Sequence, residues 1–385
     1  MFNILTLNKI SKSGLSHFDA NCFACSDSFE NPDAVIVRSA AMHDMAFSDN
    51  LLAIARAGAG VNNIPIDRCT ESGICVFNTP GANANAVKEL VICALFLASR
   101  KIVAGAEWCK TLKGEGANVG KAVEKGKSNF AGPEILGKTL GVFGLGAIGI
   151  KVANAAKALG MEVIGYDPFI TDNTKAALAD GIALTDSTDD IFAKSDYITL
   201  HAPLNDATRG VVCAANLAKA KDGVRILNFA RGELVDNGDI LAALASGKCA
   251  AYATDFPTDD QLQADGVIAI PHLGASTPEA EENCAVMAVC QLSDYLLNGN
   301  VKNSVNFPAL SMERAGKVRI AAVTCGSCAA ALADALKAAG IRVTAQADAV
   351  RKDVGYCLFD TDDALTDETV ESLKQIEAVK AIRII

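Results

Sequence analysis

Short, almost continuous apolar runs separated by longer amphipathic stretches fill the first part of this chain. Residues 34–37, 52–55 and 75–77 each form such a run, which is typical of a strand in a parallel sheet that is buried on both faces. The segment 87–104 has one apolar face and predicts a long helix that leads into the next part of the chain. Residues 1 to about 95 therefore indicate an α/β unit.

The middle of the chain repeats a strand–helix unit. Apolar runs predict strands at 139–143, 161–166, 197–200, 225–229, 251–255 and 267–270. A helix is expected at 147–159 and another at 278–297, where the chain leads back to the first domain. We therefore predict two Rossmann-like α/β domains, a discontinuous one at 1–97 and 275–312 and a second one at 98–274.

Residues 316–385 show a different pattern. Apolar runs and amphipathic segments there predict, in chain order, a strand, a helix, two strands, a helix and a strand, at 318–323, 328–339, 341–348, 354–360, 366–378 and 380–385. A βαββαβ order of elements is typical of a ferredoxin-like fold. We therefore predict a third, C-terminal domain at 316–385.

The segment GVFGLGAIG at 141–149 lies between a predicted strand and a predicted helix. In this context the glycine spacing is the fingerprint of a dinucleotide-binding turn. Gly144 would permit the tight turn, Gly146 would let the backbone approach a pyrophosphate, and Gly149 would let the helix pack against the strand.

The helix after this turn begins with Ala147 and Ile148. Its unpaired N–H groups and its dipole would hold the pyrophosphate. The next strand ends at Asp167, 18 residues after the last glycine of the motif. A carboxylate there accepts hydrogen bonds from the ribose hydroxyls and repels a 2′-phosphate, so we predict NAD rather than NADP as the cofactor.

The composition excludes several classes of protein. A formal net charge of −10 argues against nucleic acid as a partner, because phosphate binding needs a basic face. No apolar run reaches the length of a membrane span, and no signal peptide is evident, so we expect a cytoplasmic protein with no membrane partner. The 13 cysteines are then expected to be reduced thiols. Cys325 and Cys328 form a CxxC pair, but no second pair completes a zinc site, so no metal is expected.

Polar residues follow four of the predicted strands in the middle of the chain. They are His201, Arg231, Asp255 and His272. The carboxyl ends of parallel strands meet at one edge of the sheet, and open α/β sheets bind ligands at that edge. The convergence of four polar clusters favours a functional site over four separate structural roles.

Five blocks of sequence resemble those of the D-isomer-specific 2-hydroxyacid dehydrogenases. They are GKTLGVFGLGAIG, LHAPL, NFARGELVD, ATDFP and PHLGAST. The resemblance covers roughly residues 1–310, and the order of elements in the tail is similar to that of an ACT regulatory domain. The family implies an NAD-dependent oxidoreductase that acts on a small 2-hydroxyacid and forms a homodimer or homotetramer.

The block Ala57–Asn62, PHLGAST and the appended tail resemble the branch of the family that oxidises D-3-phosphoglycerate to 3-phosphohydroxypyruvate, the first step of L-serine synthesis. A phosphorylated 2-hydroxyacid is therefore the expected substrate. Dehydrogenases of lactate, glycerate or erythronate phosphate are alternatives within the family, and a non-enzymatic NAD(H) sensor on the same fold is an alternative outside catalysis. The tail has no asparagine or histidine at 324–328 to hold an amino acid, so a dimerisation module without a ligand is equally compatible with it.

The resemblance assigns catalytic roles residue by residue. Arg231 corresponds to the arginine that holds the substrate carboxylate and polarises the reacting carbonyl, a role that suits a bidentate, permanently charged guanidinium. His272 corresponds to the catalytic acid/base, because an imidazole titrates near neutral pH. The family has a glutamate beside this histidine, and Thr258-Asp259-Asp260 stands in its place. We expect Asp260 to be the partner, with Asp259 as the alternative.

The resemblance also implies cofactor contacts at the other strand ends. Asp255 corresponds to the residue that contacts the nicotinamide carboxamide. The remaining expected cofactor contacts are His201, Pro203, Thr208, Ala230 and Gly274.

Substrate contacts are expected in the first domain. Arg38 and Ser39 follow a predicted strand, as the substrate-binding pair of the family does. The backbone of Gly58, Ala59 and Gly60 would present N–H groups to a carboxylate.

Overall fold

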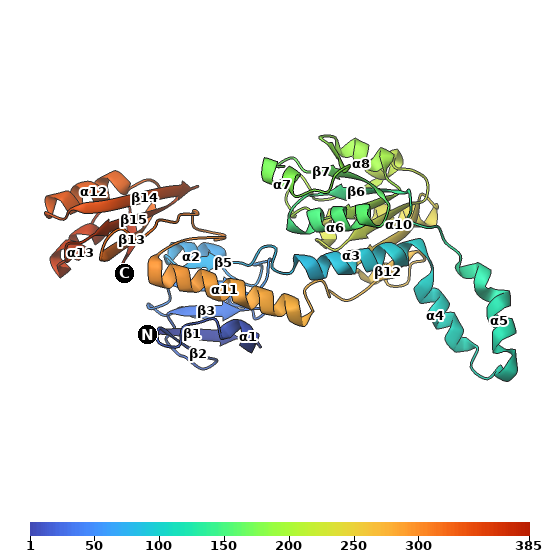
Figure 1. Ribbon diagram of the computed structural model, residues 1–385, viewed down its shortest axis with the longest axis horizontal. Coiled ribbons are helices and arrows are strands. Elements are labelled where there is room, and N and C mark those ends of the chain that lie inside the picture. Colours follow the sequence, from blue (N-terminus) through green and yellow to red (C-terminus); the bar gives the residue numbers. More distant parts are fainter. The chain divides into compact units, whose positions relative to one another are not determined.

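The computed structural model describes all 385 residues, which fold into two compact units (Figure 1). Unit 1 consists of Met1–Asn83 and Pro278–Ile385, and unit 2 consists of Ala84–Thr277. Helix α3 (Ala84–Ser99) belongs to unit 2 as a whole, whereas the sequence pattern placed the boundary near residue 98. The reason is packing, because Val91 and Leu95 of α3 contribute to the same core as the sheet of unit 2. None of the helices has the length and apolar character that crossing a membrane requires.

Unit 2 is built on a seven-stranded parallel sheet with the order β12-β11-β10-β9-β6-β7-β8. Its strands are β6 (Thr139–Phe143), β7 (Glu162–Tyr166), β8 (Ala183–Thr185), β9 (Tyr197–Leu200), β10 (Val224–Asn228), β11 (Cys249–Thr254) and β12 (Val267–Ala269). The strand order reverses between β6 and β9, where doubly wound sheets bind dinucleotides. The predicted strands of this unit are confirmed within two residues at each end.

Helices cover both faces of this sheet. They are α3 and α6 (Ala147–Ala158) on one face, and α8 (Thr188–Lys194), α9 (Ala214–Lys219) and α10 (Asn237–Ala245) on the other, with α7 (Asp172–Ala176) after β7. Because both faces are covered, the strands are almost continuously apolar and buried.

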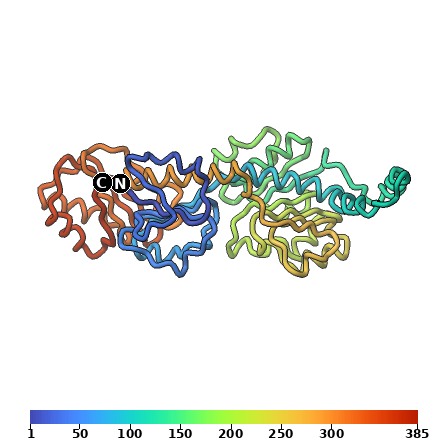
Figure 2. The backbone as a smooth tube through the Cα atoms, turned by 90° about the horizontal axis from the view of Figure 1, so that it is seen from below, coloured from blue at the N-terminus to red at the C-terminus, as the bar shows by residue number.

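A helical excursion between α3 and β6 was not predicted. The chain leaves the helical path at Arg100, and α4 (Ile102–Thr111) and α5 (Val119–Gly126) follow with short 3-10 turns at Gly116–Asn118 and Lys127–Phe130. Neither α4 nor α5 contains a buried residue, and Figure 2 shows both extending away from the sheet of unit 2. The apolar stretch predicted as one helix to residue 104 is therefore split between two helices.

Unit 1 contains a five-stranded parallel sheet with the order β2-β1-β3-β4-β5. Its elements are β1 (Phe2–Leu7), α1 (Lys12–Leu15), β2 (Phe23–Ser26), β3 (Ala34–Val37), β4 (Ala53–Arg56), α2 (Ile66–Glu71), β5 (Cys75–Phe77) and the returning helix α11 (Pro278–Asn298). Helix α11 buries Ala285, Val289 and Leu292 against one face of the sheet. Cys69 of α2 packs against the other face.

The C-terminal segment of unit 1 has the predicted βαββαβ order. It runs through β13 (Val318–Cys325), α12 (Ala329–Ala338), β14 (Val343–Arg351), β15 (Val354–Thr361), α13 (Asp367–Lys374) and β16 (Val379–Ile384). The four strands form an antiparallel sheet in the order β14-β15-β13-β16, with α12 and α13 packed on one face (Figure 1).

The other face of this sheet packs against the rest of unit 1. The ring of Tyr356 lies 5.9 Å from that of Phe307, and the ring of Tyr295 on α11 lies 5.5 Å from that of Phe77. The Tyr356 hydroxyl also donates to the carbonyl of Gly299, just after α11. The tail and the first sheet therefore share one hydrophobic core.

A fully buried ion pair fixes this junction. Arg319 on β13 and Asp360 on β15 are both inaccessible to solvent, and two hydrogen bonds of 2.7 and 2.8 Å join them. Burial raises the pKa of Asp360, but the hydrogen bonds from Arg319 and the Ala315 N–H, together with the charges of Arg319 and Arg314, outweigh it, and the pKa lies below its ordinary value. Arg319 also donates to the carbonyls of Asn298, Met312 and Glu313, so it ties α11 and the linker after it to the C-terminal sheet.

We predict that Arg319→Ala lowers the free energy of unfolding by about 3–5 kcal/mol, because it leaves the carboxylate of Asp360 buried without a partner. Urea unfolding would measure the change. Lys374→Ala is the matched control, since Lys374 pairs with Glu371 on the surface of the same domain and such pairs contribute less than about 1 kcal/mol. Equal effects of the two substitutions would contradict a role for the buried pair in fixing the junction.

Candidate functional site

The turn between β6 and α6 requires glycine at two positions. Gly144 has φ +96, and a Cβ there would lie 2.8 Å from the backbone nitrogen of Ala202. A Cβ at Gly149 would collide with the carbonyl oxygen of Gly144, so glycine lets the helix start against the strand. The roles expected for these two glycines agree with their geometry.

The N-terminus of α6 is open to a ligand. Gly146 is exposed, and a Cβ added there would meet no atom within 4 Å. Ala147 is also exposed and Ile148 is half-buried, and as first-turn residues their N–H groups have no partner within the helix. This end of the helix can therefore accept a pyrophosphate without displacing a side chain.

Asp167 follows β7 beside the glycine turn. One carboxylate oxygen accepts from the N–H of Leu145 at 2.8 Å and the other accepts from the N–H of Phe169 at 2.9 Å. The carboxylate is thus fixed next to the turn, and each oxygen keeps a lone pair for a ribose hydroxyl. This arrangement fits the expected role in choosing NAD.

The residues after β9 form a structured loop. His201 is held by Thr199, with 2.9 Å between the ring Nε2 and the hydroxyl oxygen, and burial lowers the pKa of His201 to about 3. The histidine is therefore neutral at physiological pH and cannot act as a general acid there. Thr208 donates to the carbonyl of Pro203 at 2.7 Å and so closes the loop beside the glycine turn.

Arg231 comes after β10 in an extended conformation at the start of the 3-10 turn Gly232–Leu234. Buried Asn228 accepts from the N–H of Ala230 and donates to the carbonyl of Arg231, so it holds both residues in place. The guanidinium of Arg231 is exposed and donates to the Ala230 carbonyl at 2.6 Å. Its other N–H groups remain able to bind a carboxylate.

Asp255 has the most unusual environment of these residues. It is 3% exposed at the end of β11, and neither of its carboxylate oxygens has a hydrogen-bond partner. Burial raises its pKa to about 6, although the nearby guanidinium of Arg231 opposes the shift. Buried carboxylates normally have hydrogen-bond donors around them. The carboxylate of Asp255 can therefore accept hydrogen bonds from a group that is not part of the protein.

His272 lies close to the same strand ends. Its ring centroid is 4.7 Å from that of Phe256, the residue after Asp255. A Cβ at Gly274 would lie 3.9 Å from a carboxylate oxygen of Asp255 and 3.2 Å from Val87. The structure therefore brings Asp255, His272 and Gly274 to one edge of the unit 2 sheet, as predicted from their positions after strands.

The two acids expected beside His272 lie on the 3-10 turn Asp259–Gln261. Both Asp259 and Asp260 are exposed, so burial does not distinguish them. The turn itself is anchored, because buried Gln261 donates to Asn237 at 2.7 Å and accepts from the N–H of Thr258. The choice between the two acids stays a prediction.

In unit 1, Arg56 ends β4, and Arg38 directly follows the neighbouring strand β3. Val37 is paired with Arg56 in the register of β3 and β4, so Arg38 and Arg56 lie at the same edge of the sheet. Nε of Arg56 donates to the carbonyl of Arg38 at 3.0 Å. Arg56 is not among the residues singled out from the sequence, although it ends a strand immediately before the loop that begins at Ala57, much as Arg38 directly follows its own strand.

The loop after Arg56 has a glycine in contact with that side chain. The guanidinium of Arg56 lies over Gly58, where an added Cβ would displace it from its present position. Asn78 donates to the carbonyl of Ala59, which fixes the loop. Ala59 is exposed and Gly60 is half-buried, whereas Ser39, also exposed, donates its N–H to Asn8.

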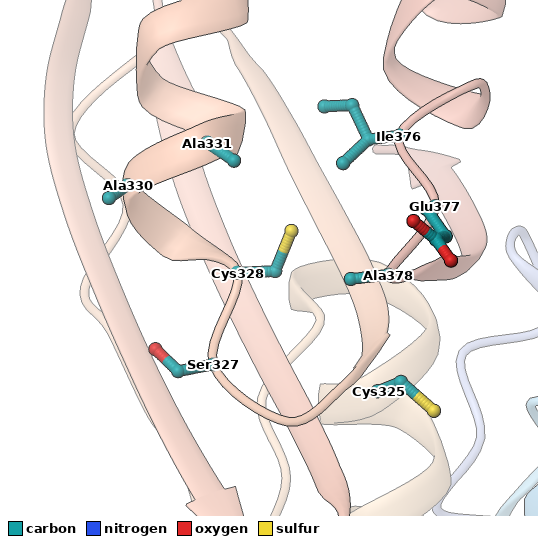
Figure 3. Close-up of a pocket in the computed structure, with 8 residues that line it drawn as sticks. All are labelled: Cys325, Ser327, Cys328, Ala330, Ala331, Ile376, Glu377 and Ala378. Atoms are coloured by element: carbon teal, nitrogen blue, oxygen red, sulfur yellow. The ribbon is translucent and has the colours of Figure 1, made fainter.

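A hollow of about 700 Å³ lies in the C-terminal sheet domain (Figure 3). It is lined by Cys325, Ser327, Cys328, Ala330, Ala331, Ile376, Glu377 and Ala378. Glu377 is the single charged residue among them, so no cation is present to hold an amino acid carboxylate. In Figure 3 the sulfur of Cys328 points into the hollow and that of Cys325 points away from it, so the CxxC pair forms no disulfide.

Residues 92–274 match the family described as D-isomer specific 2-hydroxyacid dehydrogenase, NAD binding domain. The D-3-phosphoglycerate dehydrogenase of Methanocaldococcus jannaschii is 35% identical over 302 residues, a match that covers 76% of this chain and 55% of that protein. The chain belongs to the D-isomer-specific 2-hydroxyacid dehydrogenase family. Its unit 2 is an NAD-binding domain.

The matched relatives are longer than this member of the family. The D-3-phosphoglycerate dehydrogenase of Bacillus subtilis is 34% identical over 339 residues, a match that covers 83% of this chain and 62% of that protein. The chain therefore spans between about half and two thirds of the length of such relatives.

Solved structures show the same architecture. The NAD⁺-bound 3-phosphoglycerate dehydrogenase of Entamoeba histolytica has a TM-score of 0.61 and 25% identity over 80% of this chain and 99% of that chain. The D-mandelate dehydrogenase of Rhodotorula graminis, at 20% identity, has a TM-score of 0.66 over 81% of this chain and 99% of that chain, which shows the fold alone.

We predict that Asp255→Asn raises the free energy of unfolding at pH 7.5 by up to about 3 kcal/mol, since one unit of pKa corresponds to about 1.4 kcal/mol. The pKa of Asp255 is raised from 3.8 to about 6 in the folded protein. At pH values between 3.8 and about 6, the carboxyl group of Asp255 is protonated in the folded protein and ionised in the unfolded chain. The free energy of unfolding therefore falls as the pH rises through this range.

Urea unfolding at several pH values would test this expectation. In Asp255→Asn the fall in stability between pH 4 and 6 should be reduced, whereas Asp259→Asn, at an exposed position, should leave it unchanged. An unchanged pH dependence in Asp255→Asn would show that the carboxylate is not held in an unfavourable environment.

Proposed function

We propose that this protein catalyses the NAD-dependent oxidation of D-3-phosphoglycerate to 3-phosphohydroxypyruvate. The observation that carries the proposal is the convergence of Arg231, Asp255 and His272 at one edge of the NAD-binding sheet. Similarity to several D-3-phosphoglycerate dehydrogenases supports the choice of substrate. The two arginines at the ends of β3 and β4 support a substrate with a further anionic group.

The cofactor contacts in this proposal follow the geometry of unit 2. The N-terminus of α6 holds the pyrophosphate, and the fixed carboxylate of Asp167 accepts from the ribose hydroxyls. The unpaired carboxylate of Asp255 would be available to accept from the carboxamide of the nicotinamide. When bound, NAD supplies the acceptor for the hydride that leaves C2 of the substrate.

Two residues act on the substrate in this mechanism. The exposed guanidinium of Arg231 binds the substrate carboxylate in a bidentate manner and polarises the oxygen on C2. The imidazole of His272 takes the proton of the C2 hydroxyl as the hydride leaves, and returns it in the reverse reaction. A carboxylate from the turn Asp259–Gln261, preferably that of Asp260, supports the protonated imidazole.

The substrate contacts expected in unit 1 suit a phosphate group. Phosphate oxygens suit the guanidinium groups of Arg38 and Arg56, because arginine binds phosphate in a bidentate, charge-assisted manner. The N–H groups of Ala59 and Gly60 would add neutral donors, whereas the N–H of Gly58 donates to the carbonyl of Arg56.

Initial rates with NAD over a panel of D-2-hydroxyacids would test the proposed function. The value of kcat/KM should be highest for D-3-phosphoglycerate, above those for D-glycerate, D-lactate and erythronate 4-phosphate. A higher value for another acid would move the protein to a different branch of the family. Tight NADH binding without turnover of any of these acids would favour the non-enzymatic sensor.

We predict that His272→Ala lowers kcat by a factor on the order of 10² to 10⁴, the usual contribution of a positioned acid/base. The dissociation constant for NAD should change little, because the pyrophosphate and ribose contacts are elsewhere in unit 2. Retention of kcat within about threefold would assign His272 a structural role.

The partner of His272 can be identified in the same assay. The pH profile of kcat/KM should be distorted in Asp260→Asn, because the imidazole loses its charge support, and Asp259→Asn is the matched control one residue away. The opposite result would assign the role to Asp259.

We further infer that the protein assembles as a homodimer, or as a homotetramer built from such dimers, through the helices α4 and α5. These helices bury no residue within the chain, and Trp108 packs against Phe130 with ring centroids 5.2 Å apart, so the excursion is ordered mainly by its own contacts. Helices of this length are only marginally stable alone in water. Residues 101–130 carry six lysines and three glutamates in a chain of net charge −10, so a second copy offers an acidic partner.

We predict that the double substitution Ile102→Glu and Val103→Glu lowers the mass of the oligomer, because both side chains are about half exposed on α4, at 50% and 52%. Analytical ultracentrifugation would measure the mass. Phe169→Glu is the control, since Phe169 is 85% exposed elsewhere in unit 2. A monomeric unmodified protein, or a double variant with unchanged mass, would contradict the assignment of this interface.

The C-terminal sheet domain, with its βαββαβ order, fits an ACT-type domain. We propose that its role is structural, because it shares a core with the first sheet and its hollow lacks a cation for an amino acid ligand. A cytoplasmic location is consistent with the free state of all the cysteines.

A further inference from the structure

The two arginines of unit 1 are accompanied by a carboxylate that the proposed mechanism does not use. Oε1 of Glu281 lies 2.6 Å from Nη1 of Arg38, and the two side chains are 39% and 30% exposed. Glu281 lies in the first turn of α11, where the helix dipole stabilises a negative charge. The ion pair therefore joins the end of β3 to the beginning of α11.

The three charged groups form one cluster. Burial raises the pKa of the Cys284 thiol, on the next turn of α11; the charges of Arg38 and Arg56 lower it, and that of Glu281 raises it. Arg38 links the three residues, because its guanidinium pairs with Glu281 and its carbonyl accepts from Nε of Arg56 at 3.0 Å. The cluster has two positive charges and one negative charge, so Glu281 halves the net positive charge that an incoming anion would meet.

From this geometry we infer that Glu281 is a specificity-determining residue that positions the guanidinium of Arg38 and limits its affinity for the anionic group at the far end of the substrate. The inference rests on the proposed function, in which Arg38 and Arg56 bind the phosphate. An anionic oxygen on Arg38 has to share the guanidinium with the carboxylate of Glu281. The phosphate and the carboxylate of Glu281 would then bind the same guanidinium, and their repulsion weakens the binding of the phosphate. The binding of a substrate with a neutral hydroxymethyl group in this place is not affected.

Glu281→Gln tests this role while preserving a hydrogen bond to Arg38. The KM for D-3-phosphoglycerate should fall by roughly three- to tenfold, a modest change because the ion pair is partly exposed. The KM for D-glycerate should stay within about twofold, because that substrate lacks the phosphate, and kcat should not rise.

Glu279→Gln is the matched control, because Glu279 is an exposed acid in the same turn of α11 and the substitution removes the same charge. This variant should leave both KM values unchanged. An unchanged or higher KM for D-3-phosphoglycerate in Glu281→Gln would overturn the inference, as would equal changes for the two substrates or equal effects of the two variants.

A second measurement does not depend on turnover. Inorganic phosphate should raise the midpoint of thermal unfolding more in Glu281→Gln than in Glu279→Gln, and the same assay shows whether each variant is folded. Absence of D-3-phosphoglycerate turnover in the unmodified protein would refute the proposed function, whereas equal phosphate effects in the two variants would refute the role of Glu281.

Discussion

Parallel strands impose the constraint on which the functional arrangement of this protein depends. Each strand of such a sheet must be followed by a crossover, so the carboxyl ends of neighbouring strands lie at one edge. In unit 2 this constraint brings together residues that follow β6, β7, β10 and β11. In unit 1 the same constraint places Arg38 and Arg56 side by side. In each unit the topology of the sheet is sufficient to place these residues at one edge, whatever contacts their side chains make.

The groups gathered at these edges are not optimised for stability. Asp255 is buried without a partner, and its environment favours the neutral acid. Arg38 and Arg56 place like charges at neighbouring strand ends, and Glu281 offsets part of the repulsion. Unfavourable electrostatics of this kind persist where a ligand supplies the missing partner, and the surrounding cores provide the stability that compensates for them.

Helix α11 connects the first sheet of unit 1 to the C-terminal sheet. Its first turn carries Glu281, its middle covers the sheet of unit 1, and the carbonyl of its last residue, Asn298, accepts a hydrogen bond from Arg319. The ring of Tyr295, near its end, contacts the aromatic cluster of the junction. The C-terminal sheet is therefore held by the same helix that positions the carboxylate beside Arg38. A domain that is appended in the sequence is part of one core in the structure.

The sequence by itself did not indicate β1 and β2, but it determined the strands of unit 2 other than β8, the βαββαβ order of the C-terminal segment, the glycine turn and the acid after β7. Each of these depends on periodicity or spacing within a few tens of residues, so local pattern is sufficient. The tertiary structure decided the break at Arg100, because a helix continues or ends according to what is available to pack against it. It also decided the pairing of Glu281 with Arg38, the cluster that includes Arg56, and the burial of Arg319 with Asp360. These contacts join residues far apart in the chain, and no local pattern encodes which distant side chain a charge will meet.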